Sequence, residues 1–257
     1  MGGYEKMKSK KILGILLLLS IVVGLFWILN SMLPKSQAMV LQVGIALAIL
    51  VLWVIGKMIT IYRLQKLLSQ PNHLLYEDKD PLAYSEEMQK LLPQVDGRQQ
   101  KDLIAINIAA AQLYAGDYAA VHSWLEQVAL PGQPEVNRVL YYVYKSMAYF
   151  LNEQKEEGLA LVEQERNLFQ KYSHTASGIT SNILVLYAYE KNANHAFTEA
   201  LSILEEVEER KVSSILQDLV DYGKLNCYRN LKMEEERAAM KKVLKKAKLV
   251  PAIAHKI

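Results

Sequence analysis

The sequence predicts an all-α protein in which two transmembrane helices precede an array of helical hairpins. Two long runs without charged residues lie within the first 66 of its 257 residues. After them, apolar residues recur at the three- and four-residue spacing of helices, for example over residues 101–115, and no stretch shows the alternation typical of strands. A third observation is that the helical segments repeat along the rest of the chain.

The first apolar run covers residues 12–34 and is predicted to form a transmembrane helix over about residues 12–33. It contains no charged residue and 15 Leu, Ile, Val or Phe, which together favour insertion by roughly 5 to 9 kcal/mol. At about 1.5 Å per residue, the run is long enough to cross a hydrocarbon core about 30 Å thick. A cleaved signal peptide is the alternative, since residues 36–38 resemble a cleavage site, but its apolar region would be shorter.

A second apolar run covers residues 36–56 and is predicted to form a transmembrane helix over about residues 39–61. The run holds 11 Leu, Ile or Val, with one polar interruption at Gln42. Lys57 can extend its amine toward the lipid headgroups. Residues 34–36 are only long enough to reverse the chain direction, so the two helices are expected to form a hairpin.

Basic residues predict the topology of this hairpin. The first 66 residues carry eight Lys or Arg and one Glu, and the turn between the two runs has only Lys35. By the positive-inside rule, both termini face the cytoplasm of a multi-pass protein of the cell membrane. Residues 1–66 are then the anchor, residues 67–99 a helical linker or first helix, and residues 100–257 the cytosolic array.

The remaining composition argues against several classes of function. Residues 67–236 carry a net charge of −11, so a broad phosphate-binding surface for nucleic acid is not expected. The single cysteine, Cys227, leaves no internal disulfide and no cysteine-based zinc site, which fits a reducing compartment. The five histidines are scattered, and no phosphate-binding or nucleophile motif is present. We therefore expect no enzymatic activity, no cofactor, no metal and no small-molecule substrate.

A two-helix pattern repeats after residue 100. Turn-like steps occur at four places, namely Gly116-Asp117, Asn152-Glu153, Asn192-Ala193-Asn194 and Asn230-Leu231. Each step precedes a small or aliphatic residue that is expected to pack in the second helix of a pair. These residues are Val121, Gly158, Ala200 and Ala239, and they lie 37, 42 and 39 residues apart. A period in this range with two helices per unit is typical of an α-solenoid.

The clearest unit reads Ala-Ala-Ala-Gln-Leu-Tyr-Ala-Gly-Asp-Tyr over residues 109–118, followed by Val121 and Leu125. It looks like the end of a first helix, a Gly-Asp-Tyr turn and the packing positions of a second helix. Similar positions are filled in the next two units by Ser146, Tyr149, Gly158, Val162, Ala188, Ala200, Leu204 and Val207. On these residues the chain resembles the tetratricopeptide repeat family over about residues 100–248.

The resemblance implies a concave face, built from the first helices, that grips an extended peptide or a helix of a protein partner. Matched by position, the candidate peptide-binding face consists of Leu113, Tyr114, Val143, Met147, Phe150, Asn182, Val185 and Tyr189. The carboxylate clamp of some family members is not matched, because Ile106, Ala110 and Met147 replace its polar residues. An apolar or aromatic ligand surface is the remaining expectation. The alternative is that the tyrosines of this region pack between hairpins.

The last 21 residues carry seven basic side chains and no acidic one. A final helix is predicted over about residues 235–249, with Val243 and Leu244 on its apolar side. It could cap the array, whose outer face must be polar, or its lysines could contact anionic lipid on the cytoplasmic leaflet. The candidate lipid-contacting residues are Lys241, Lys242, Lys245, Lys246 and Lys248.

These features predict a membrane-anchored cytosolic adaptor or scaffold that binds protein partners at the inner face of the membrane. Anchoring would raise the effective concentration of a partner beside the membrane. The alternative is an accessory subunit of a membrane transport or envelope-synthesis complex, which would act through its transmembrane hairpin.

Overall fold

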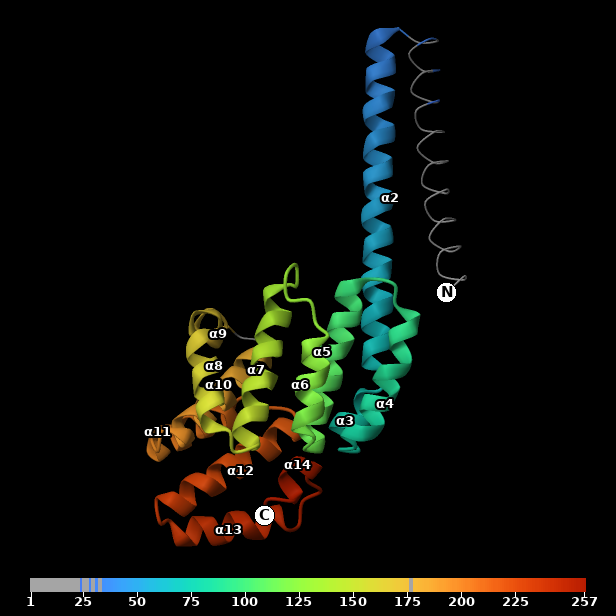
Figure 1. Cartoon of the computed structure of the whole chain (residues 1–257). Coiled ribbons are helices and arrows are strands. Elements are labelled where there is room, and N and C mark those ends of the chain that lie inside the picture. The colour runs from blue at the N-terminus through green and yellow to red at the C-terminus, as the bar shows by residue number, and fades with distance from the viewer. Residues whose placement is uncertain (1–23, 25–27, 29–30, 32–33, 176–177) are drawn as a thin grey trace. The chain divides into compact units, whose positions relative to one another are not determined.

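The computed structural model describes residues 34–175 and 178–257, together with Gly24, Ile28 and Ser31 (Figure 1). Every regular element within these residues is a helix, and none is a strand, so the all-α prediction is confirmed for the described part of the chain. The chain divides into two compact units, Met1–Leu64 and Gln65–Ile257.

The long helix α2 spans Lys35–Ser69. Within it, Gln42–Ser69 is long and apolar enough to cross a membrane, and its apolar window is not covered by other residues. Leu52 and Trp53, for example, are exposed. This is the one candidate span among the described residues, and it contains most of the second predicted span. The first predicted span, residues 12–33, lies almost entirely outside the described residues.

The second compact unit, Gln65–Ile257, consists of helices joined by tight turns and is called the helical unit below. In chain order these are α3 (Asn72–Tyr76), α4 (Pro81–Leu91), the 3₁₀ turn η1 (Leu92–Gln94), α5 (Arg98–Ala115), α6 (Tyr118–Glu126), α7 (Glu135–Leu151), α8 (Lys155–Gln164), α9 (Arg166–Ser173), α10 (Gly178–Ala193), α11 (Phe197–Glu209), α12 (Ser214–Asn230), α13 (Glu234–Leu244) and α14 (Pro251–Ala254).

Residues 67–99, expected as a linker or first helix, contribute a packed helix to this unit. Asp80 begins α4 as its N-cap, since its Oδ1 accepts the N–H of Ala83 at 3.0 Å. Helix α4 packs against α5 and buries Tyr84 and Met88. The helical unit therefore extends N-terminal to the predicted array.

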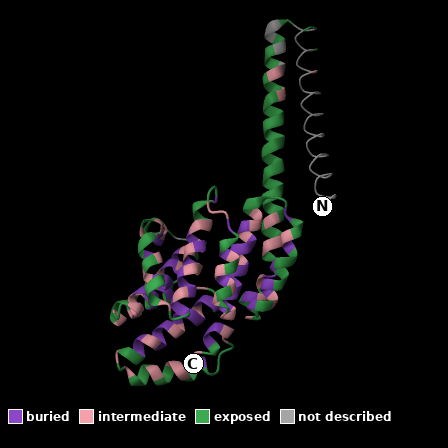
Figure 2. Cartoon of the chain, viewed as in Figure 1, coloured by how far each residue is buried: buried purple, intermediate pink, exposed green. Residues whose placement is uncertain are grey.

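Four helical hairpins follow, α5/α6, α7/α8, α10/α11 and α12/α13, and the helices of each pair pack against one another. The first helices also contact in sequence, α5 with α7, α7 with α10 and α10 with α12. Buried residues gather where these helices face each other (Figure 2). The extra helix α9, which packs against α10, lies between the second and third hairpins. It accounts for the longer interval, 42 residues, between Gly158 and Ala200.

The four turns within the hairpins share one backbone conformation. Each contains a residue with a positive φ, and the four are Gly116, Glu153, His195 and Lys232. In each turn the N–H of the following residue donates to the carbonyl five positions earlier, over 2.9–3.0 Å: Asp117 to Gln112, Gln154 to Tyr149, Ala196 to Lys191 and Met233 to Tyr228. This is the Schellman arrangement that satisfies the last carbonyls of a helix. The positive-φ residues of the first two turns lie within the predicted steps, and those of the last two, His195 and Lys232, lie one residue beyond them.

The register predicted for the fourth unit was wrong. The residue that corresponds to Val121 is Arg237 rather than Ala239, because Arg237 N–H bonds the Met233 carbonyl as Val121 N–H bonds that of Asp117. Ala239 is exposed. No fifth hairpin follows α13 in the described residues, and the packing position of α13 that corresponds to Val121 carries the polar side chain of Arg237.

The final helix is shorter than predicted and the chain then turns back. Helix α13 ends at Leu244 instead of about residue 249. Beyond the exposed lysines, residues 250–253 are mostly buried and α14 packs against both α5 and α12. Helix α3 also contacts α12, where Ser214 Oγ donates to the Tyr76 carbonyl at 2.5 Å. The two ends of the helical unit thus meet at α12.

Candidate functional site

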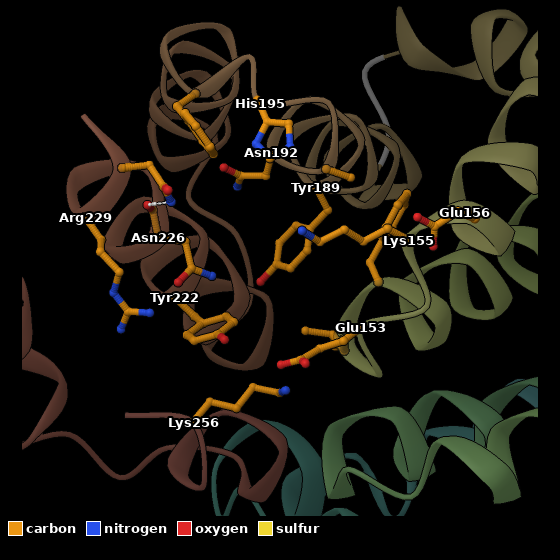
Figure 3. Close-up of a pocket in the computed structure, with 15 residues that line it drawn as sticks. Glu153, Lys155, Glu156, Tyr189, Asn192, His195, Tyr222, Asn226, Arg229 and Lys256 are labelled. Atoms are coloured by element: carbon orange, nitrogen blue, oxygen red, sulfur yellow. Dashed lines mark hydrogen bonds between the residues drawn. The ribbon is translucent and has the colours of Figure 1, made fainter. Parts of the chain in front are cut away.

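A cavity of about 570 Å³ lies at the turn ends of three hairpins (Figure 3). Its walls come from the α7–α8 turn, the α10–α11 turn, α12 and the segment after α14. Polar and charged side chains dominate the lining, and they are Glu153, Lys155, Glu156, Asn192, His195, Asn226, Arg229, Asn230 and Lys256. The shared turn conformation places these side chains together, because it starts each second helix at the same end of the array.

Aromatic side chains form the floor of the cavity. Tyr189 is buried and its hydroxyl donates to the Leu219 carbonyl at 2.9 Å. Burial raises the pKa of Tyr189 well above its ordinary value, so this side chain stays neutral. Tyr222 is half-buried and more accessible. Phe150 also lines the cavity and lies over Gly158, where a Cβ atom would come within 2.7 Å of its ring.

The charged side chains at the rim have no charged partner within the described residues. Lys256 points toward Glu153, Lys155 and Glu156 lie beside each other on one side, and Arg229 lies on the opposite side (Figure 3). None of the five forms an ion pair within 4.0 Å with another described residue, whereas other charged residues of the unit do. Their charges are therefore available to groups that enter the cavity, with three cations against two carboxylates.

Cys227 lies next to Asn192, which lines the cavity, and its thiol has low reactivity. Its Sγ donates to Asn192 Oδ1 over 3.4 Å, and burial raises the pKa of its thiol to about 11. Because the thiolate is the reactive form of cysteine, this thiol is a weak nucleophile at neutral pH. The role of Cys227 is to orient the Asn192 carboxamide and to fill space in the core.

The cavity presents aromatic faces, carboxamides and unpaired charges, which are groups that can form hydrogen bonds or ion pairs with a polar ligand. Among the described residues, no group of three or more His, Cys, Asp or Glu side chains could hold a metal ion. Comparison with protein-family models, with characterised proteins and with solved structures shows no match.

The residues of the candidate peptide-binding face mostly lie in the core. Phe150 and Tyr189 reach the cavity. Asn182 is half-buried and donates to the Gly178 carbonyl at 3.0 Å, away from the cavity. The remaining residues are buried without lining it, and they are Leu113, Tyr114, Val143, Met147 and Val185. Leu113 and Tyr114 belong to α5, against which α14 packs, and the other three belong to α7 and α10, which pack against each other.

Tyrosines of this region contact other aromatic rings both within α7 and between α7 and α6. Tyr141 and Tyr142 meet edge to face with ring centres 5.0 Å apart, and Tyr149 lies 4.5 Å from the ring of His122. Burial raises the pKa values of Tyr114 and Tyr144. These rings contribute apolar area to the core and remain neutral at physiological pH.

The five candidate lipid-contacting lysines lie apart from the cavity. Lys241 is half-buried, while Lys242, Lys245, Lys246 and Lys248 are exposed. Lys241 and Lys242 belong to the last turn of α13, and the other three lie on the connection that leads to α14. Lipid contact by these lysines remains a prediction.

Apart from Phe150 and Tyr189, the residues that line the cavity were not predicted as site residues from the sequence, and among them are Tyr222, Asn226, Arg229 and Lys256. The first three follow the spacing of one helix face on α12. That spacing was visible, but it does not indicate which neighbour the face meets. Lys256 reaches the cavity only because the chain turns back after α13.

Proposed function

We propose that the protein is a membrane-anchored adaptor that binds a polar segment of a partner protein in the cavity at the turn ends. The observation that carries this proposal is the set of five unpaired charged side chains around an aromatic floor. Glu153, Lys155, Glu156 and Arg229 are exposed and Lys256 is half-buried, so water solvates most of these charges in the free protein. Their convergence on one cavity, with both signs present, favours a ligand that carries complementary charged groups.

The lining indicates the chemistry of the partner segment. Arg229, Lys155 and Lys256 outnumber the two carboxylates, so the segment presents at least one carboxylate. Asn226 and the Tyr222 hydroxyl offer both donors and acceptors to a peptide backbone. Charge-assisted hydrogen bonds contribute about 1.5 to 3 kcal/mol each, so a few such contacts are enough for a reversible complex.

Helix α2 supports the membrane part of the proposal. Its apolar side chains between Gln42 and Ser69 are exposed, and lipid would cover them. Together with the predicted first span, this helix would hold the chain at the inner face of the membrane, with both termini in the cytoplasm. The gain for an adaptor is a raised local concentration of its partner.

We also propose that the four hairpins form a tetratricopeptide-like solenoid. The repeated turn with its positive φ residue supports this, since Gly116, Glu153, His195 and Lys232 are 37, 42 and 37 residues apart. The ordered contacts between successive first helices support it as well. In such an array, neighbouring hairpins bury each other's apolar faces.

The proposal is tested by cross-linking from within the cavity. The full chain, carrying a photoreactive amino acid in place of Tyr222, is irradiated in its native membrane. A discrete protein adduct is expected, and a charge reversal at Arg229 (Arg229→Glu) should abolish it. Lys242→Glu is the matched control because Lys242 is an exposed cation outside the cavity. Equal adduct yields from the two variants would rule out the cavity as the binding site.

The exposed apolar surface of α2 also supports the second candidate function. In that function the protein is a subunit whose membrane helices pack against those of partner proteins. Replacing residues 1–64 by an unrelated two-span anchor separates the two functions. The adaptor retains its Arg229-dependent adduct after the exchange. A subunit that acts through its membrane helices loses its association although the cavity is unchanged.

A further inference from the structure

Residues 250–253 pack against two helices that are distant in sequence, α5 and α12. The surface of these two helices that contacts residues 250–253 is called the seat. Helix α14 packs against both α5 and α12, and Figure 1 shows it at the end of α5. Val250 and Ile253 are completely buried and Ala252 nearly so. The preceding residues 245–248 are exposed, so a polar connection leads into an apolar seat.

The seat has a buried hydrogen-bond acceptor. The N–H of Val250 donates to Asp218 Oδ2 at 2.9 Å, and Asp218 Oδ1 pairs with Lys79 Nζ at 2.7 Å. Asp218 belongs to α12 and is only 3% exposed. One oxygen of this carboxylate is thus held by the protein, while the other receives the incoming backbone N–H.

The seat also has a glycine that permits close approach. Gly116 ends α5 with φ +86°, and a Cβ atom there would lie 3.3 Å from the Cα of Ala252. The absence of a side chain lets the backbone of residue 252 approach the end of α5. A positive φ explains the glycine by itself, but the contact makes it part of the seat as well.

The way in which residues 250–253 bind resembles peptide docking more than the packing of another hairpin. Val250 is extended, with φ −65° and ψ 146°, and Pro251 follows it. One backbone hydrogen bond and three small apolar side chains make the contacts. Pro251 is the first residue of the short helix α14, and its fixed φ lowers the entropy cost of ordering a segment of this kind when it binds.

We propose that this seat is a binding site for short apolar peptide segments, and that the chain's own residues 250–253 occupy it as a tethered ligand. The partner it fits is a segment that reads small aliphatic, Pro, small, aliphatic, with a free N–H on its first residue. Such a segment binds by displacing residues 250–253. The seat is separate from the cavity described above. Displacement of residues 250–253 would nevertheless move Lys256 away from the cavity wall.

The first experiment releases the tether without changing the seat. A specific protease site is inserted between Ala247 and Lys248, in the exposed connection, and the purified full chain is cleaved in detergent. A labelled synthetic peptide of residues 249–257 is then titrated in. The cleaved protein should bind it at least about 100-fold more tightly than the uncleaved protein, since a tethered competitor acts at roughly millimolar effective concentration.

Two altered peptides test the chemistry of the seat. Methylation of the backbone nitrogen at the Val250 position removes the donor to Asp218, and the affinity for the cleaved protein should fall at least tenfold. A peptide with Asp at the Ile253 position should not bind, because that side chain is completely buried. Both changes are in the peptide, so the protein remains identical in every titration.

Three results would overturn the proposal. Equal affinity of the peptide for cleaved and uncleaved protein would place its binding elsewhere. A cleaved segment that stays bound through extensive dilution and excludes the labelled peptide would be a permanent part of the core. Loss of amide hydrogen-exchange protection throughout α5 and α12 after cleavage would mean that the segment is required for folding rather than bound as a ligand.

Discussion

Lys79 Nζ lies 2.7 Å from Asp218 Oδ1, although 139 residues separate the two in the sequence. The same carboxylate accepts the N–H of Val250. Both side chains of the ion pair are largely buried, with 13% and 5% of their surfaces exposed. One carboxylate therefore joins the connection before α4, helix α12 and the segment before α14.

Replacing Lys79 by Met should destabilise the helical unit by about 3 kcal/mol, because a buried carboxylate is left without its cation. Methionine keeps the length of the side chain, and the positive φ of residue 79 is equally strained in both proteins. Chemical denaturation followed by circular dichroism measures the change. The control is Lys90→Met, which removes an exposed ion pair with Glu87 and should leave the midpoint unchanged. Similar midpoints for the two variants would contradict a structural role of the buried pair.

Gly158→Val should destabilise the unit by about 2 kcal/mol. The Cβ atom alone would lie 2.7 Å from the ring of Phe150, and overpacking of a core contact costs about 1 to 3 kcal/mol. Valine is a better helix former than glycine, so a loss in Gly158→Val reports the contact with Phe150. Ala160→Val, at an exposed position of the same helix, is the control and should cost only the propensity difference between alanine and valine, about 0.6 kcal/mol. An equal loss in both variants would show that helix α8 can move away from Phe150 without cost.

The repeated turns predict opposite effects of glycine at two corresponding positions. Lys232 is exposed and has φ 59°. Lys232→Gly relieves the backbone strain of this positive φ, but glycine also raises the conformational entropy of the unfolded chain. The difference should stabilise the unit by about 0.5 kcal/mol. Gly116→Ala should destabilise it by more than about 1 kcal/mol, since the turn is strained and Ala252 lies close. Thermal unfolding compares both with the unchanged protein. Changes of the same sign would refute the shared turn conformation.

Cys227 predicts a loss of stability at alkaline pH. Burial raises the pKa of its thiol from 9.0 to about 11 in the folded state, so the unfolded chain loses this proton first as the pH rises. Stability should therefore fall between about pH 9 and 11, and less so in Cys227→Ala. The measurement is the pH dependence of the denaturation midpoint of both proteins. Parallel curves would show that the thiol does not titrate differently on folding.

The thiol should also be unreactive in the folded protein. A thiol reagent at pH 8 should modify Cys227 only after denaturant unfolds the unit, because a buried, neutral thiol lacks both access and nucleophilicity. Mass spectrometry of the labelled protein gives the modified fraction. Rapid labelling in buffer alone would mean that α12 opens locally.

Leu52→Arg should impair membrane insertion of residues 42–69. An arginine near the centre of a span costs about 3 kcal/mol, and the favourable contribution of leucine is lost as well. Glycosylation mapping of the full chain measures the inserted fraction. Gln65→Arg, near the end of the same helix, is the control because its charge can reach the headgroups. Equal insertion of both variants would argue against α2 as a span.

Local features of the helical unit could be predicted from the sequence. The Gly-Asp step at residues 116–117 ends one helix and caps the next through Asp117, whose Oδ1 accepts the Ala120 N–H at 2.9 Å. The other turns lack glycine, but the polar pairs around Asn152 and Asn230 indicated them. These signals are local because the backbone groups that they satisfy lie within six residues of each other.

The pairing of distant faces could not be predicted in this way. Tyr114 and Val185 were assigned to an open surface by position in a repeat, yet both are buried. A repeat template states which face a residue takes on its helix, but not what covers that face. Helix α14, which packs against the α5 helix of Tyr114, lies outside the repeated units.

By itself, the sequence determined the helical class, an apolar helix suited to a membrane, the four hairpin turns and the separation of charge along the chain. Each of these depends on neighbours in sequence, through hydrogen bonding, spacing or composition. Only the tertiary structure decided that residues 250–253 return to α5 and α12, and that Lys256 joins Arg229 at one cavity. These placements depend on long-range burial around Asp218, a buried carboxylate whose partners no local pattern identifies.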